Sequence, residues 1–142
     1  MFSSNLNPAK SYSAVGLASG AMSASPHGLV SMLFEGASTA VASARMYQEL
    51  DKPVQKSQSI AKAVGIITDG LMASLDREAG GEMAERLYSL YEYMAMRLSE
   101  ANVGRSEPAL QEVGRLLSEL HAAWKQIGKT DTTGQGAPAG EG

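Results

Sequence analysis

The feature that most constrains this 142-residue chain is a run of apolar residues at helical spacing in its second half. Between positions 83 and 101 they recur three or four positions apart, which keeps them on one face of an α-helix. This face consists of Met83, Leu87, Leu90, Met94, Leu98 and Ala101. A second row runs beside it and consists of Ala84, Tyr88, Tyr91 and Ala95. The run predicts a core-facing helix whose apolar sector is wider than one neighbouring helix requires.

Three other segments show the same periodicity. The first begins at Ser25 and Pro26, since serine caps free N–H groups and proline suits the first helical turn. The second contains Gly65 and Gly70, each of which costs about 1 kcal/mol inside a helix. We expect these glycines to allow a close approach, by another helix of the bundle rather than by a bound peptide. The third has a heptad seam over 110–127.

The predicted fold is therefore all-α, an antiparallel up-down-up-down four-helix bundle with an N-terminal arm, because short turns force consecutive helices to run antiparallel. We expect one bundle domain at 25–128, with helices at about 25–49, 54–77, 82–102 and 107–127. Residues 1–24 are rich in small and polar residues and are expected to form a flexible or docking arm. Residues 129–142 contain no large apolar residue and are expected to be a disordered tail.

Composition excludes several classes of function. The chain has 12 basic and 15 acidic residues without a basic run, which argues against nucleic acid as a partner. It has no cysteine, which excludes disulfides and thiolate metal sites. No apolar run approaches the roughly 20 residues of a spanning helix, so we expect no membrane insertion and a location in the cytoplasm.

We find no catalytic constellation and expect a protein that is not an enzyme and has no cofactor and no metal site. The two histidines, His27 and His121, lie at opposite ends of the folded sequence, with no metal-ligand spacing. Because some four-helix bundles are histidine phosphotransfer modules, His121 remains an alternative. It borders the heptad seam and is followed by the bulky Trp124, which favours a partly buried structural histidine.

The surplus apolar surface points instead to a protein that binds a helix in a groove. Methionines such as Met72, Met94 and Met96 adapt to irregular partners, and tyrosines can bury a ring while the hydroxyl stays in water. Candidate partner-binding residues on these grounds are Ile66, Met72, Tyr88, Tyr91, Tyr93 and Met94. If the arm docks, its anchors are Tyr12, Val15 and Leu17. The alternative is a structural bundle that closes this surface against a second copy as a homodimer.

Several motifs in order resemble the FliS family of flagellar export chaperones. The segment 87–102 reads LYSLYEYMAMRLSEAN and is similar to the third helix of that family. The segments 22–26 and 29–36 resemble its entry into the first helix. Glu112-Val113 and Ala123-Trp124-Lys125 resemble its last helix. Together these segments cover roughly Tyr12 to Ile127.

The resemblance implies a cytoplasmic chaperone for flagellum biogenesis whose partner is the C-terminal segment of flagellin. Burying that segment would prevent premature polymerisation and keep flagellin competent for type III secretion. The resemblance also implies contact with a component of the flagellar export gate, although no stretch of this sequence marks the docking surface. The positions that match family motifs are Tyr12, Tyr91, Tyr93, Arg97 and Leu98.

We hypothesise that the arm around Tyr12 occupies part of the groove until flagellin displaces it, because Tyr12, Val15 and Leu17 form an apolar cluster in a polar segment. Deleting residues 1–20 should therefore change the affinity for flagellin in a binding titration. An unchanged affinity would remove the arm from the binding mechanism.

Overall fold

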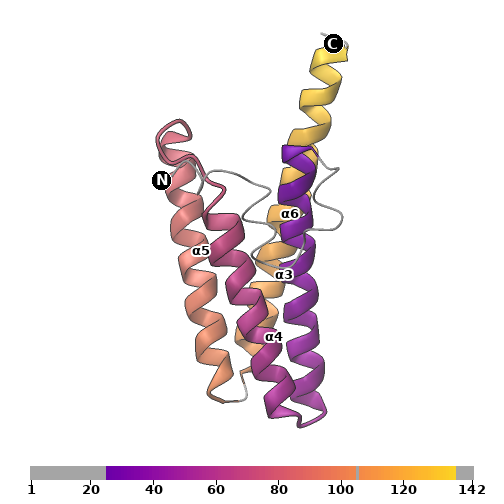
Figure 1. Cartoon of the computed structure of the whole chain (residues 1–142), viewed down its shortest axis with the longest axis vertical. Helices are drawn as coiled ribbons and strands as arrows, with labels where there is room; N and C mark the ends of the chain where they lie inside the picture. The colour runs from indigo at the N-terminus through magenta and orange to yellow at the C-terminus, as the bar shows by residue number, and fades with distance from the viewer. Residues whose placement is uncertain (1–24, 105, 137–142) are drawn as a thin grey trace.

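The computed structural model describes residues 25–104 and 106–136, and the side chains up to residue 128. Within these residues the chain forms four helical rods and no strand, which confirms the predicted bundle. The rods are α3 (Pro26–Glu49), α4 (Pro53–Gly65) continued by η2 (Ile66–Met72), α5 (Gly81–Asn102) and α6 (Glu107–Gly136). Successive rods run in alternate directions (Figure 1). The expected arm lies outside the described residues.

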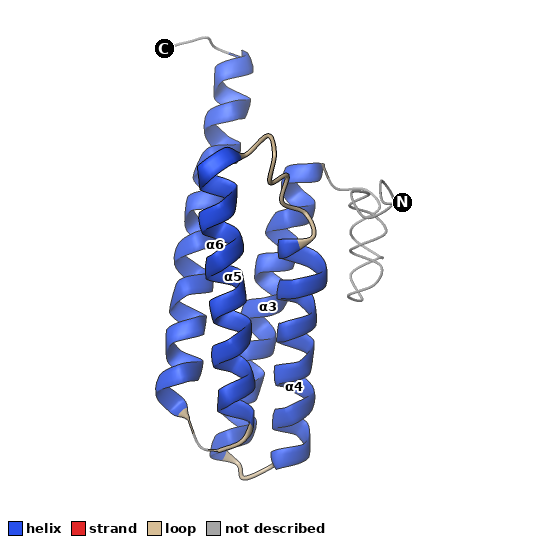
Figure 2. Ribbon diagram, turned by 90° about the vertical axis from the view of Figure 1, so that its left-hand side faces the viewer, coloured by secondary structure: helices blue, strands red, loops and turns tan. Residues whose placement is uncertain are grey.

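The helices form a ring in which each rod packs against two others. The rod of α4 and η2 packs against α3 and α5, and α6 packs against α5 and closes the ring on α3. Figure 2 shows the four rods side by side with the turns at the two ends. Neighbours in sequence are thus neighbours in space, as short connections require.

Two helix ends differ from those expected. The second rod ends at Met72, before the expected end at 77, and in the turn that follows the Asp76 carboxylate accepts the backbone N–H of Ala79 at 3.0 Å. The last helix continues to Gly136, whereas we expected a disordered tail from 129. An established helix adds residues more easily than a new one nucleates, so polar residues can extend α6. This end of α6 projects past the start of α3 (Figure 1).

Small residues on α3 allow its neighbours to approach closely. Ala37, Ala40 and Ala44 are all buried in the core, on the side where α3 meets both the α4 rod and α6. The wide apolar sector of α5 is likewise used inside the bundle, because α5 has two neighbours rather than one. In its second row, Ala84 and Tyr91 are buried. Most of the surplus apolar surface inferred from the sequence is therefore core.

The two glycines of the second rod have different environments. A side chain at Gly70 would place its Cβ 2.7 Å from Cδ2 of Leu33, so α3 crosses closely there, as expected for a helix of the bundle. At Gly65 an added Cβ would meet nothing within 4 Å, so packing does not explain this glycine. Gly65 is followed directly by η2, a stretch of π-helix.

Four side chains fasten the start of α3 to α6 and are called the α3–α6 latch: His27, Ser31, His121 and Trp124. The rings of His27 and Trp124 stack at 4.6 Å, and the Trp124 indole N–H donates to the carbonyl of His27 at 2.9 Å. Nε2 of His27 lies 2.6 Å from the carbonyl oxygen of Trp124. Ser31 Oγ and His121 Nε2 are 2.7 Å apart. His121 is partly buried and has structural contacts, which favours the structural interpretation of this histidine.

The glycine environments predict opposite stability effects. Gly65→Ala should raise the free energy of unfolding by up to about 1 kcal/mol, because the methyl group enters open space and the unfolded chain loses freedom. Gly70→Ala should gain less or lose stability, because the Leu33 side chain must repack. Urea unfolding of both variants measures the difference. Equal gains in the two variants would contradict the close approach at Gly70.

The latch predicts a pH dependence of stability. Burial, followed by the nearby Lys125 ammonium, lowers the pKa of His121 below its ordinary value of 6.5, while Glu35 acts in the opposite direction. A lowered folded-state pKa gives a contribution that is complete above pH 6.5 and is lost as pH falls through the folded value. The free energy of unfolding should therefore fall with decreasing pH more steeply in the wild type than in His121→Gln. Urea unfolding at a series of pH values tests this, and parallel profiles would contradict it.

Candidate functional site

Four of the candidate partner-binding residues lie in the core. Ile66, Tyr91, Met94 and Leu98 are almost completely inaccessible and pack with the other buried residues of the bundle. A partner can reach them only if helices move apart. The sequence pattern did not separate them from surface positions, because a core face and a groove face have the same helical period. Three further candidates, Tyr12, Val15 and Leu17, lie outside the described residues.

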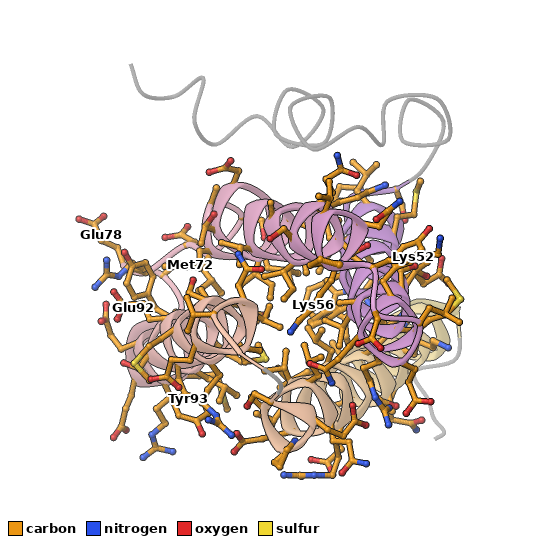
Figure 3. The ribbon with its side chains drawn as sticks, turned by 90° about the horizontal axis from the view of Figure 1, so that it is seen from below. Lys52, Lys56, Met72, Glu78, Glu92 and Tyr93 are labelled. Atoms are coloured by element: carbon orange, nitrogen blue, oxygen red, sulfur yellow. The ribbon has the colours of Figure 1, made fainter. Side chains whose placement is uncertain are left out.

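The other candidates, Met72, Tyr88, Tyr93 and Arg97, do not form one patch. Tyr88 and Arg97 are about two and a half turns apart on α5, which places them on opposite flanks of the helix. Figure 3 shows Met72 between the α4 rod and α5, and Tyr93 on the side toward α6. The predicted residues therefore divide between two interfaces of α5.

The flank toward α6 carries a polar cluster that we call the α5–α6 brace: Tyr93, Arg97 and Glu112. The Tyr93 hydroxyl lies 2.8 and 2.9 Å from the two carboxylate oxygens of Glu112, and Arg97 Nε donates to the same carboxylate at 2.8 Å. Both hydrogen bonds lower the pKa of Glu112, and the bond from Arg97 has the larger effect. Tyr93 and Arg97 thus have a partner within the bundle, and sequence reasoning missed the role of Glu112 in this cluster.

The other flank is covered by the turn between η2 and α5. The Arg77 guanidinium lies 3.9 Å from the centre of the Tyr88 ring, a cation–π contact. The same guanidinium donates to both carboxylate oxygens of Glu85, at 2.9 and 3.0 Å, and this hydrogen bonding lowers the pKa of Glu85. The turn is therefore fastened to α5 and restricts access to Tyr88. No motif in the sequence marked Arg77.

Two methionine side chains remain largely exposed on α5, one near its start and one on the face opposite the core. Met83 is 63% exposed and Met96 is 50% exposed, and Tyr93 lies one turn from Met96. Because methionine is flexible and polarizable, such a surface accommodates apolar side chains of different shapes. A partner can contact Met83 near the start of α5, or Met96 together with Tyr93, without any movement of the bundle.

Sequence reasoning missed a second exposed apolar group, at the end of the bundle that carries the α3–α4 and α5–α6 turns (Figure 1). We call it the end patch, and it consists of Met46, Leu50, Val54 and Val103. Val103 is 89% exposed. Residues of both turns also line a hollow of about 490 Å³. Leu50 and Val54 lie on either side of a polar turn, and this arrangement is the sequence feature that could have indicated the end patch.

Lys56 is buried at the end patch and fixes the turn between α5 and α6. Its ammonium donates to the carbonyl of Gly104 at 2.5 Å, and Figure 3 shows its side chain directed between the helices. Gln48 is also buried and accepts the backbone N–H of Ser106 at 3.3 Å. These contacts position the α5–α6 turn.

The described side chains provide contact surfaces. They contain no group of three or more His, Cys, Asp or Glu side chains that could bind a metal ion. Both histidines are in the α3–α6 latch. No helix among the residues searched is long and apolar enough to cross a membrane. The chemistry available at these surfaces is apolar contact and hydrogen bonding.

Comparison with known proteins agrees with this description. The family model described as flagellar protein FliS matches residues 8–131. The chain is 48% identical to the flagellar secretion chaperone FliS of Salmonella typhimurium, over 83% of this chain and 87% of that protein. It is 41% identical to FliSB of Pseudomonas aeruginosa, over 83% and 93%, and 38% identical to FliS of Escherichia coli, over 82% and 86%. The chain belongs to the FliS family of flagellar secretion chaperones.

Proposed function

We propose that this protein is a cytoplasmic export chaperone without enzymatic activity that binds the C-terminal segment of flagellin. Its relatives are named flagellar secretion chaperones, which supports a role in secretion. The observation that carries the proposal is that Met83 and Met96 remain largely exposed on α5 although the bundle has a complete core. These side chains are available to bury the apolar face of another segment.

The proposed mechanism is masking. A flagellin segment that is disordered in the free subunit folds along the chaperone and buries the apolar face it would use in the filament. The ordering entropy offsets part of the contact free energy, so the complex stays releasable for export. The α5–α6 brace and the turn held by Arg77 would keep α5 rigid while its exposed methionines take part in binding. We propose an export-gate component as a second partner.

The proposal predicts binding of a synthetic peptide that covers about the last forty residues of the host's flagellin. Isothermal titration calorimetry should show one-to-one binding with a negative heat-capacity change, because apolar surface is buried. Circular dichroism should show more helix in the mixture than in the two separate components. A peptide of the same composition in scrambled order is the matched control.

Absence of both heat and helix gain with the native peptide would contradict the chaperone proposal. Sedimentation of the protein alone then decides the alternative. A mass that rises with protein concentration would favour the self-associating bundle. A constant monomer mass would argue against both flagellin binding and self-association.

A further inference from the structure

The hydroxyl group of Tyr91 is buried and has no hydrogen-bond partner among the described residues. Tyr91 is 3% exposed, and none of the described residues forms a hydrogen bond with its hydroxyl. Burial raises the pKa of this hydroxyl far above its ordinary value. Buried tyrosine hydroxyls usually have a hydrogen-bond partner, because an unpaired one loses its hydration without replacement. Phenylalanine would suit this position better in the free protein.

Tyr91 lies beside η2. The hydroxyl of Ser57 donates to the side-chain oxygen of Asn102 at 2.7 Å, which fixes the register of the α4 rod against α5. Counting equally along the two antiparallel helices from that pair places Tyr91 level with Thr68 in η2. The hydroxyl of Thr68 donates to the carbonyl of Val64 at 2.9 Å, and it forms no hydrogen bond with Tyr91.

η2 is the part of the second rod whose backbone departs from the regular α-helix. It is π-helical, a conformation that occurs mainly as short stretches and frequently at functional sites. Gly65 directly precedes it, and an added Cβ there would meet nothing within 4 Å, although Ile66 and Ile67 of η2 are buried in the core. After Met72 the regular helix stops. A shift of η2 away from α5 would uncover the side of α5 that carries Tyr91.

We propose that Tyr91 is a partner-contact residue, whose hydroxyl donates a hydrogen bond to a backbone carbonyl of the bound flagellar segment after η2 shifts away from α5. This inference rests on the proposed function. A backbone carbonyl is the acceptor that an apolar segment always has, whereas its side chains offer none. The hydroxyl is then unpaired in the free chaperone and paired in the complex.

Tyr91→Phe tests this inference because it should change stability and binding in opposite directions. The free variant should melt several degrees higher than the wild type, since a buried unpaired hydroxyl is removed. Its affinity for the flagellin C-terminal peptide should be about tenfold lower, since the partner's carbonyl loses its donor. Thermal unfolding and calorimetric titration provide the two values.

Tyr47→Phe is the matched control. Tyr47 is a half-buried tyrosine of α3 near the opposite end of the second rod, and its loss of a hydroxyl should change neither value. Amide hydrogen exchange provides an independent measurement. The amides of residues 66–72 should lose protection when the wild type binds the peptide, and unchanged protection would contradict the shift of η2.

The outcomes separate this inference from the proposed function. A wild type that binds and a Tyr91→Phe variant that binds equally well would overturn the role of Tyr91 and leave the chaperone proposal intact. A free Tyr91→Phe variant that melts lower than the wild type would show that the hydroxyl already has a favourable interaction, and would also overturn it. A wild type that does not bind the peptide would overturn both.

Discussion

The close packing of α3 against both the α4 rod and α6 is the constraint on which the rest of the structure depends. It requires small side chains on α3, which Ala37, Ala40 and Ala44 supply, and a glycine at position 70, where Leu33 crosses. Larger side chains would increase the spacing between these helices and open the core. With α3 in place, α5 completes the ring by packing on the two remaining faces.

Polar contacts fix the ends of this bundle and the register of its helices. The α3–α6 latch joins the start of α3 to the middle of α6. At the other end, Arg45 forms an ion pair with Glu107, while Lys56 and Gln48 fix the α5–α6 turn. Such contacts have directional geometry that apolar packing lacks, so they select one arrangement among similar packings. The exposed ion pairs among them add little to stability.

The core uses most of the apolar surface of the helices, and this limits where a partner can bind. In the described part of the chain, the large apolar side chains that remain exposed are Met83, Tyr93 and Met96 on α5, Ile127 on α6, and those of the end patch. The core also contains the Tyr91 hydroxyl, a buried group without a hydrogen-bond partner among the described residues, and η2, whose backbone is π-helical. A chaperone must bind its client and later release it, and a bundle with one less regular segment provides a place for a reversible change. The rest of the scaffold can then stay folded.

The sequence by itself determined the number of helices, their approximate limits and their antiparallel order, because helical periodicity and short turns are local properties. It also determined, through its motifs, the family. Only the tertiary structure decided which apolar residues are core. Tyr91 and Met94 share the periodicity expected of a groove, but α5 has two neighbouring helices that bury them. Likewise Tyr93 and Arg97 bind Glu112, and Arg77 covers Tyr88, through contacts between separate elements. Periodicity reports which face of a helix is apolar, whereas the number of helices that cover that face depends on the packing of the whole chain.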